Sequence, residues 1–383
     1  MKSLLYGNIV LPDMVMKSAC IELENGKINA FYDQYQDGAV GNENQWILPG
    51  FIDVHMHGIG CGEPATKGGL IEMAAFAPSC GVSRLCPTLG TASIETTHEY
   101  LSNIRELVNN PVAGALIAGA HLEGPYMNPE RPGGMDKELL RKADAEELKH
   151  FLSLAGGYLK ILTISPEITD SELIMEICGE AGCVVSAGHT ICGADRFDHY
   201  VDKGVSHICH LFDTFEGRKV HNGVSQPALT DMILLDDRLT CEIIMDGLHV
   251  PPSLVKLALK AAGPERIIAI TDSMQGAGLP DGKYTMSDGR EYILTNGGVC
   301  TLEDGTIVGS CLTMNQAFIN MVSKFGFNAC EASKALSGNP AKLLGLDNVC
   351  GKLEAGMSAD IAVLNPDGSV EKCFVEGNEV YAS

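Results

Sequence analysis

The stretch Leu48-Pro49-Gly50-Phe51-Ile52-Asp53-Val54-His55-Met56-His57-Gly58 decides how the rest of the chain is interpreted. An apolar run from Trp46 to Val54 leads into two histidines that are two residues apart. If this run is a β-strand, His55 and His57 point to the same side, because side chains alternate along a strand. Two imidazoles on one face can bind a metal ion, although an isolated His-X-His motif also occurs as a pair of surface histidines beside a turn.

The size and composition of the chain indicate a globular protein. It has 383 residues, of which 45% are hydrophobic and 20% charged. No apolar run reaches the roughly 18 residues that a membrane-spanning helix needs. The formal net charge of −22 argues against nucleic acids and anionic membranes as partners, because both would repel the chain. Solubility alone explains this charge, and an anionic small substrate is still compatible with it.

The N-terminus and the cysteines bear on where the protein works. The first residues, Met1 to Leu5, are not followed by a long apolar segment or a small-residue cleavage site, so we expect no signal peptide and a cytoplasmic protein. Fourteen cysteines are scattered singly, without a Cys-X-X-Cys motif. In a chain of this length they are typical of reduced thiols, not of a disulfide framework or a cysteine zinc site.

Between Trp46 and Leu344, apolar strand-like runs alternate with helix-like segments. Eight strands are predicted, at residues 51–55, 82–86, 114–121, 158–165, 183–187, 205–209, 240–246 and 266–271. The segments 94–108, 144–154 and 171–180 have amphipathic helical patterns, and Thr169 or Asp170 is the expected N-cap of the last. This α/β alternation predicts a parallel sheet. Eight strands favour closure into a (β/α)8 TIM-type barrel, and an open doubly wound sheet is the alternative.

Both ends of the chain are rich in β-strand signals. The N-terminal part has strand-like runs at 4–10 and 19–23, with Asn25-Gly26 as a hairpin signal, and the C-terminal part has runs at 359–364, 370–375 and 378–381. We expect the two ends, 1–48 and 346–383, to form one small discontinuous β-sandwich domain. The barrel domain is then expected at 49–345.

Side chains that bind metals or transfer protons follow several of the predicted strands. In a parallel barrel the active site forms at the carboxyl ends of the strands. These ends carry His55 and His57 after the first strand, Glu123 after the third, His189 after the fifth, His210 after the sixth and Asp272 after the eighth. Each residue alone could be part of a turn or a helix cap. Their occurrence at the same end of the strands predicts one site.

Histidine and carboxylate ligands without cysteine suit Zn²⁺, and also Fe²⁺, Mn²⁺ or Co²⁺. We expect Glu123, His189 and His210 to form the core metal site, with a coordination position open for water. His55 and His57 could hold a second ion that shares Glu123. Asp272 is the expected catalytic base, which takes a proton from the metal-activated water and later gives one to the leaving group.

Other polar residues near the predicted site have supporting or open roles. His207 lies three residues before His210 and faces the opposite way on a strand, and His121 is expected deeper in the barrel, so both are predicted to support the ligands. His249 follows the seventh strand and is expected to contact the substrate. A basic cluster beyond the sixth strand is either an anion site at the barrel mouth or a solvated loop, and it consists of Arg218, Lys219 and His221.

These motifs resemble the N-acetylglucosamine-6-phosphate deacetylase family of the amidohydrolase superfamily over nearly the whole chain. The resemblance is carried by residues 48–53, 121–125, 187–189, 210–212, 246–250, 271–272, 309–314, 339–341 and 351–360. It implies a metal-dependent barrel with a split β-sandwich, usually a cytoplasmic homodimer, which hydrolyses the acetamide of an amino-sugar phosphate. By position it implies Glu123, His189 and His210 as metal ligands and Asp272 as the catalytic acid/base. Some members bind one metal ion, and others that keep both first-strand histidines can bind two.

Three departures from the family pattern concern the substrate. Asp213-Thr214-Phe215 stands where the family usually has Asn-Ala-Met, and a carboxylate at this position would repel a phosphate. Met135 stands where the family has a histidine that polarises the scissile carbonyl. The loop at 216–222 is slightly shorter than the family loop with a phosphate-binding arginine, so Arg218 is an approximate equivalent, with His221 beside it.

We therefore expect a hydrolase that removes the N-acetyl group of N-acetylglucosamine 6-phosphate or of a close N-acetyl amino-sugar phosphate. The departures keep a second hypothesis open, in which the same reaction acts on another N-acyl sugar derivative or a different amide, with or without a phosphate. A catalytically inactive sugar-sensing protein is a third hypothesis, suggested by Met135. The retention of every proposed ligand and of Asp272 speaks against it.

Overall fold

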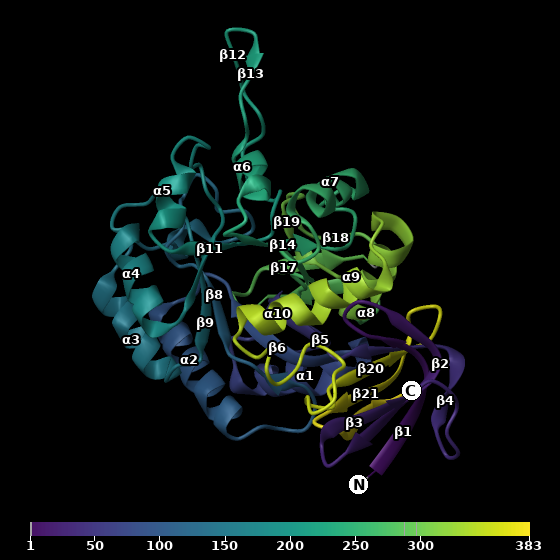
Figure 1. Ribbon diagram of the computed structural model, residues 1–383. Helices are drawn as coiled ribbons and strands as arrows, with labels where there is room; N and C mark the ends of the chain where they lie inside the picture. Colours follow the sequence, from purple (N-terminus) through teal and green to yellow (C-terminus); the bar gives the residue numbers. More distant parts are fainter. Residues whose placement is uncertain (1, 287, 296) are drawn as a thin grey trace.

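An eight-stranded parallel barrel forms the centre of the computed structural model, which describes residues 2–286, 288–295 and 297–383 (Figure 1). The strands are ordered β15-β14-β11-β10-β9-β8-β6-β5 and pair in parallel. Their bounds are β5 (Phe51–Met56), β6 (Val82–Leu89), β8 (Ala120–Glu123), β9 (Leu159–Ile164), β10 (Val184–Ala187), β11 (Val205–Ile208), β14 (Thr240–Ile244) and β15 (Ile267–Ile270). The predicted alternation is confirmed, except that the third predicted strand is divided into β7 (Leu116–Ile117), which pairs with β6, and β8.

The barrel closes through contacts between β5 and the segment that follows β15. The backbone N–H of Asp272 donates to the carbonyl oxygen of His55 at 2.9 Å, and the Thr271 hydroxyl donates to Asp53 Oδ2 at 2.6 Å. The closed barrel that the sequence favoured over an open sheet is therefore confirmed. Closure also places Asp272 directly beside the histidines of the first barrel strand.

Helices follow most of the barrel strands and cover the outside of the barrel (Figure 1). Helix α2 begins after Ser93, whose side chain accepts a hydrogen bond from the Thr96 N–H, and α3 begins in the same way after Asp144. Of the described helices, none combines the length and the hydropathy needed to cross a membrane. The helices are α1 (Lys67–Phe76), α2 (Ile94–Asn109), α3 (Ala145–Ala155), α4 (Ser171–Ala181), α5 (Phe197–Asp202), α6 (Leu229–Leu235), α7 (Pro252–Ala262), α8 (Met314–Asn320), α9 (Ala329–Ser333) and α10 (Asn339–Leu343).

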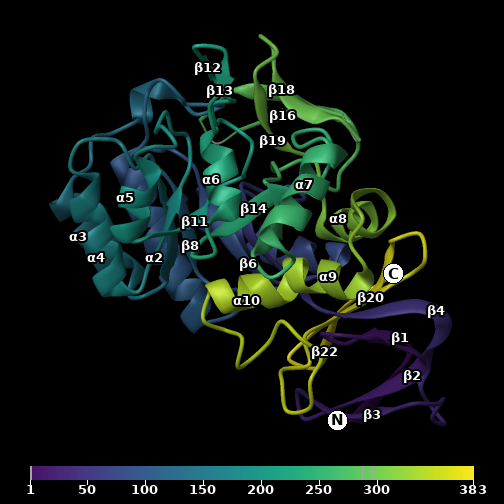
Figure 2. The ribbon, with the colours of Figure 1, turned by 45° about the horizontal axis from the view of Figure 1, so that its top comes forward.

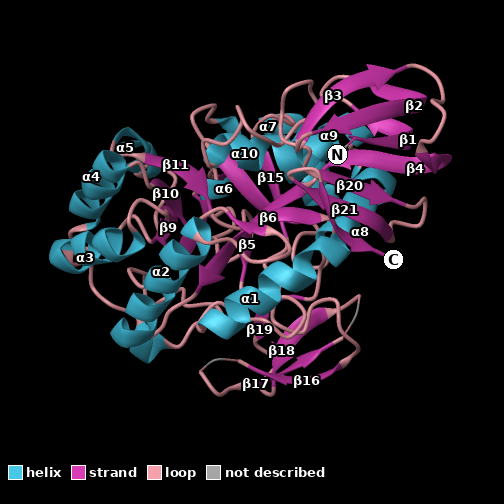
Figure 3. Ribbon diagram, turned by 90° about the horizontal axis from the view of Figure 1, so that it is seen from below, coloured by secondary structure: helices cyan, strands magenta, loops and turns pink. Residues whose placement is uncertain are grey.

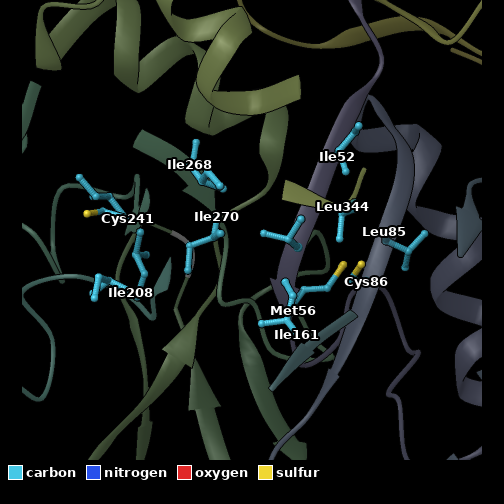
Figure 4. Packing of buried hydrophobic residues seen from close by; sticks show 14 of the residues in the cluster. Ile52, Met56, Leu85, Cys86, Ile161, Ile208, Cys241, Ile268, Ile270 and Leu344 are labelled. Atoms are coloured by element: carbon cyan, nitrogen blue, oxygen red, sulfur yellow. The ribbon is translucent and has the colours of Figure 1, made fainter. Parts of the chain in front are cut away.

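Buried apolar side chains from neighbouring barrel strands pack against one another (Figure 4). Ile52 and Met56 on β5 and Leu85 on β6 belong to this cluster, as do Ile268 and Ile270 on β15, and all five are fully buried. Burial of apolar surface is the main stabilising contribution to folding, at about 25 cal/mol per Å². The rigid strands carry the polar residues at their carboxyl ends.

The two ends of the chain meet in one sheet of seven strands, ordered β22-β21-β20-β4-β1-β2-β3. The strands are β1 (Lys2–Val10), β2 (Val15–Glu24), β3 (Lys27–Tyr32), β4 (Val40–Pro49), β20 (Ile361–Leu364), β21 (Val370–Val375) and β22 (Asn378–Ala382). The antiparallel pairing of β20 with β4 joins the C-terminal part to the N-terminal part. The run from Trp46 to Val54 is therefore divided at Gly50 between a strand of this sheet and the first barrel strand. The sheet has a hydrophobic core of its own.

Two further β elements were not predicted from the sequence. A four-stranded antiparallel sheet, which we call the insertion sheet, consists of β16 (Gly282–Thr285), β17 (Glu291–Leu294), β18 (Val299–Leu302) and β19 (Ile307–Ser310). Figures 2 and 3 show it well apart from the terminal seven-stranded sheet. A hairpin of β12 (Val220–His221) and β13 (Val224–Ser225), which we call the arm, projects from the barrel (Figure 1).

Candidate active site

Glu123, His189 and His210 converge at the carboxyl ends of the barrel strands. Glu123 ends β8, His189 comes shortly after β10, and His210 comes shortly after β11. Glu123 Oε1 lies 3.1 Å from His189 Nε2 and 3.0 Å from His210 Nε2, and the two Nε2 atoms are 3.1 Å apart. All three side chains are buried. The structure thus brings the three core ligands expected from the sequence to one point.

His55, His57 and Asp272 form a second group on the other side of Glu123. His57 Nε2 lies 3.2 Å from Asp272 Oδ1 and 3.2 Å from Glu123 Oε2. His55 Nε2 lies 3.5 Å from Asp272 Oδ1 and 3.8 Å from Glu123 Oε1. Glu123 therefore lies within contact distance of both groups.

Several residues of the site have an unusual backbone conformation. The φ angles of His189, His210 and Asp272 are 49°, 21° and 49°, in the left-handed region that side chains with a Cβ rarely adopt. Such conformations cost energy and persist where the surrounding structure requires them, typically at functional sites. Here they occur where the chain turns sharply at the end of a strand.

Hydrogen bonds to the far side of the His189 and His57 rings direct their Nε2 atoms to the centre. His189 Nδ1 lies 2.8 Å from the carbonyl oxygen of Arg131, and His57 Nδ1 lies 3.0 Å from that of Thr88. A carbonyl oxygen only accepts, so both Nδ1 atoms donate and both Nε2 atoms keep a lone pair when the rings are neutral. Gly133 allows the Arg131 loop to approach, because a Cβ there would lie 3.0 Å from the His189 ring.

The carboxylates of the site favour positive charge at its centre. Burial by itself lowers the pKa of His57 and His210, but contacts with Asp272 and Glu123 for His57, and with Glu123 for His210, raise both pKa values to about 10. Burial by itself raises the pKa of Glu123, yet the surrounding histidines hold it well below its usual range. A divalent cation provides the same kind of compensating charge to these ligands.

The donor set fits a divalent metal ion. Nitrogen and oxygen donors from histidine and carboxylate suit Zn²⁺ and the other divalent transition metals. The ligand atoms of Glu123, His189 and His210 lie within 4.8 Å of one another, and so do those of His55, His57 and Asp272. His55 Nε2 is buried and has no hydrogen-bond partner among the described residues, as expected for an atom that binds a metal ion.

His121 and His207 support the site instead of facing it. His121 hydrogen-bonds the Val54 carbonyl at 3.0 Å and the Thr163 hydroxyl at 2.8 Å, and burial together with the nearby His55 lowers its pKa to about 3. His207 Nε2 lies 3.0 Å from Glu242 Oε1. Neither side chain lines the cavity described next.

A cavity of about 200 Å³ opens above the cluster. Four of the substrate-binding residues expected from the sequence lie on its wall, namely Met135, Asp213, Thr214 and His249. His249 Nδ1 lies 2.6 Å from Asp246 Oδ2, while its Nε2 is buried and has no hydrogen-bond partner among the described residues. Met274, Val308 and Leu89 make part of the wall apolar.

The expected basic cluster is not at the mouth of this cavity. Lys219 and Arg218 lie at the base of the arm and His221 within it, and all three are exposed. Arg218 pairs with Asp231, with Nε 2.8 Å from Oδ2, and Lys219 pairs with Glu216. None of the three lines the cavity of the same chain. The segment has few apolar residues to hold it against the barrel, and Asn222-Gly223 turns it into a projecting hairpin.

Two residues of the site region were missed in the sequence. Glu242 is fully buried on β14 and contacts His55 and His207, and a lone glutamate within an apolar strand was a usable signal. Arg290 comes just before β17 of the insertion sheet. It lines the cavity and is the only arginine or lysine among the described lining residues. It donates to Asp288 Oδ2 at 2.7 Å and to the Gly134 carbonyl at 2.9 Å. Its sequence context gives no sign of this position.

Comparisons with known proteins agree with this geometry. Residues 46–380 match the model of the amidohydrolase family. The chain is 31% identical to N-acetylglucosamine-6-phosphate deacetylase of Bacillus subtilis, over 98% of this chain and 96% of that one, and 31% identical to N-acetylgalactosamine-6-phosphate deacetylase of Escherichia coli O157:H7, over 86% of each.

Solved structures show the same similarity. One is N-acetylglucosamine-6-phosphate deacetylase of Thermotoga maritima, with a TM-score of 0.86 and 32% identity over the whole of both chains. Another is a mutant of the Mycobacterium smegmatis enzyme in complex with N-acetyl-D-glucosamine-6-phosphate, with a TM-score of 0.90 and 28% identity over the whole of both chains. The chain therefore belongs to the amidohydrolase family, among the N-acetylglucosamine-6-phosphate deacetylases.

Proposed function

We propose that this protein removes the N-acetyl group of N-acetylglucosamine 6-phosphate, or of a close amino-sugar phosphate, and releases acetate and the free amine. The observation that carries this proposal is the convergence of Glu123, His189, His210 and Asp272 at the floor of one cavity. Relatives that resemble the chain over nearly its full length are named for this reaction.

The residues present would hold one or two divalent metal ions. Glu123, His189 and His210 would hold the first ion, and His55 and His57 the second, with Glu123 between them. Zinc suits these ligands best, and iron, manganese and cobalt are compatible with them. When bound, the metal supplies Lewis-acid chemistry, which polarises the acyl carbonyl and makes water more acidic.

Asp272 is the proposed acid/base. Its Oδ1 atom faces the centre of the site, 3.2 Å from His57 Nε2 and 3.5 Å from His55 Nε2, and the side chain lines the cavity. It accepts a proton from the attacking water and donates a proton to the nitrogen of the leaving amine. A carboxylate is needed for the first step and a carboxylic acid for the second, so one residue serves both in turn.

The walls of the cavity would bind the sugar and the acyl group. His249 Nε2 is placed to donate to a substrate oxygen, and Asp213 and Thr214 can hydrogen-bond sugar hydroxyls. Met135 lies on the wall without a hydrogen-bond donor for the carbonyl, so it would contact the acyl group by packing. Arg290 is the lysine or arginine side chain on the described cavity wall that could bind a phosphate, and it is already paired with Asp288.

A second candidate substrate is an N-acyl sugar derivative without a phosphate. The acidic side chains of Asp213 and Asp288 on the cavity wall favour it, because they repel an anion. The two candidates differ in one measurable property, which is the preference for the 6-phosphate.

Acetate release from a substrate panel tests both candidates. The metal-loaded protein is assayed with N-acetylglucosamine 6-phosphate, N-acetylgalactosamine 6-phosphate and plain N-acetylglucosamine. The first proposal expects the highest kcat/KM for a phosphorylated sugar. Equal or higher kcat/KM for the plain sugar would favour the second candidate, and no release from either phosphorylated sugar would contradict the first.

We also propose a cytoplasmic homodimer. All fourteen cysteines are free, as is typical of reducing compartments. The arm exposes Val220 and Val224, which are 71% and 61% accessible, and a second copy of the chain would cover them. Through the arm, Arg218 and His221 would then reach a partner chain instead of their own cavity. Analytical sedimentation tests this. The wild type is expected to sediment as a dimer and Val220→Asp as a monomer.

A further inference from the structure

Glu242 lies beneath the site and takes no part in the proposed reaction. It stands in the middle of β14, its side chain is fully buried, and it does not line the cavity. A buried carboxylate is costly unless it is fully hydrogen-bonded. Its partners therefore show what the residue is for.

The carboxylate of Glu242 contacts both groups of the site. Its Oε2 atom lies 2.9 Å from His55 Nδ1 and also accepts the backbone N–H of His210 at 3.2 Å. Its Oε1 atom lies 3.0 Å from His207 Nε2, and the other ring nitrogen of His207 lies 2.7 Å from the Thr240 hydroxyl. Both carboxylate oxygens are thus used, and His207 holds Glu242 in place from the side away from the site.

These contacts fix the state of His55. An ionised carboxylate only accepts hydrogen bonds, so Nδ1 of His55 must donate and the lone pair of the neutral ring lies on Nε2. That atom is buried, without a hydrogen-bond partner among the described residues, and faces Asp272 and Glu123. Carboxylates behind metal-binding histidines orient the ring and raise the basicity of the ligand.

We propose that Glu242 is the positioning residue that makes His55 a metal ligand and so gives the site its second ion. The inference rests on the proposed metal centre, but not on the identity of the substrate. Without Glu242, the Nδ1 donor of His55 loses its carboxylate acceptor and keeps only the weaker contact with Cys209 Sγ at 3.7 Å, so the ring can rotate or change tautomer more easily. The ion held by Glu123, His189 and His210 would be affected less, because Glu242 contacts only the backbone N–H of His210 and none of the three side chains.

Metal titration of the purified protein tests the proposal without any substrate. The metal-free protein is titrated with Co²⁺, and the absorbance of the bound ion and the metal content per chain are measured. The wild type is expected to bind two ions, and His55→Ala one. Glu242→Ala is expected to behave like His55→Ala, with the second ion bound about 10–100-fold more weakly.

Two further variants separate positioning from a general structural role. In Glu242→Gln the amide oxygen still accepts from His55 Nδ1, and the amide nitrogen can donate to His207 Nε2 when that nitrogen carries no proton. This variant should therefore regain most of the affinity for the second ion. In the His55→Ala background, Glu242→Ala should have no further effect on the remaining ion, because residues that act as one unit are not additive. Glu172→Ala, which removes an exposed carboxylate 2.9 Å from His199, is the control and should bind two ions.

The outcomes decide the proposal independently of the proposed function. The proposal is overturned if Glu242→Ala binds two ions with wild-type affinity, or if the wild type binds a single ion. It is also overturned if, in the His55→Ala background, Glu242→Ala weakens the binding of the remaining ion as much as it weakens the second ion in the wild-type background. If Glu242→Ala does not fold, the Glu242→Gln titration decides, and loss of the second ion in that variant would contradict positioning by hydrogen bonding. A protein that shows the expected titrations but no deacetylation would refute the function and leave this inference standing.

Discussion

His249 should contribute strongly to substrate binding at low and neutral pH. The residue lines the cavity, and its Nε2 atom is buried without a hydrogen-bond partner among the described residues, while Asp246 Oδ2 lies 2.6 Å from Nδ1. A hydrogen bond to a charged group contributes about 1.5–3 kcal/mol, and 1.4 kcal/mol is a factor of ten. We therefore expect His249→Ala to lower kcat/KM by about 10–150-fold, mainly through KM. Initial rates of acetate release over a range of substrate concentrations measure this.

The effect should depend on pH in one direction. Burial opposes the charged form of His249, but Asp246 outweighs it and raises the pKa above the ordinary value of 6.5. The cation is therefore present below that raised pKa and is lost as the pH rises through it. The ratio of wild-type to His249→Ala kcat/KM should be largest at low pH, stay high above pH 6.5 and then fall. His199→Ala, at an exposed histidine, is the control. A ratio near one at every pH would refute the assignment.

Other perturbations have equally definite outcomes. Asp360→Ala leaves the buried guanidinium of Arg84 without the carboxylate that lies 2.8 Å away, so the free energy of unfolding measured in urea should fall by about 3–5 kcal/mol. The control is Glu379→Ala, at an exposed pair with Lys372, which should lower it by less than about 1 kcal/mol. Replacement of both His55 and His57 by alanine should halve the metal content measured by elemental analysis, and an unchanged content would remove them from the ligand set. Chelation should abolish acetate release and added Zn²⁺ should restore it, whereas activity that survives complete metal removal would exclude a metal-dependent reaction.

The barrel and its polar strand ends could be predicted because they depend on local pattern. Apolar runs such as 159–164 are long enough to mark a buried strand, and Glu123, His189, His210 and Asp272 come directly after such runs. Since parallel strands all end on one side of a barrel, sequence position alone implied that these residues meet.

The residues that could not be predicted depend on contacts between distant segments. Glu242 stands out as a lone glutamate in an apolar strand, but its partners could not be predicted, because His55, His207 and the backbone of His210 come to it from other segments. The strands of the insertion sheet have only four residues each, and Arg290 lies between β16 and β17 in the sequence, so its position at the cavity could not be predicted. The position of Arg218 after the sixth strand is compatible with either the barrel mouth or a solvated loop, and only the fold shows that the arm carries the chain outward.

The most direct measurement of the central claim combines turnover with metal content in Asp272→Asn. This variant keeps the size of the side chain and removes its ability to accept and return a proton. We expect the same metal content per chain as in the wild type, together with a fall in kcat for acetate release from N-acetylglucosamine 6-phosphate of about 10²–10⁴-fold. Normal turnover in a fully metal-loaded Asp272→Asn protein would contradict the assignment of Asp272 as the acid/base.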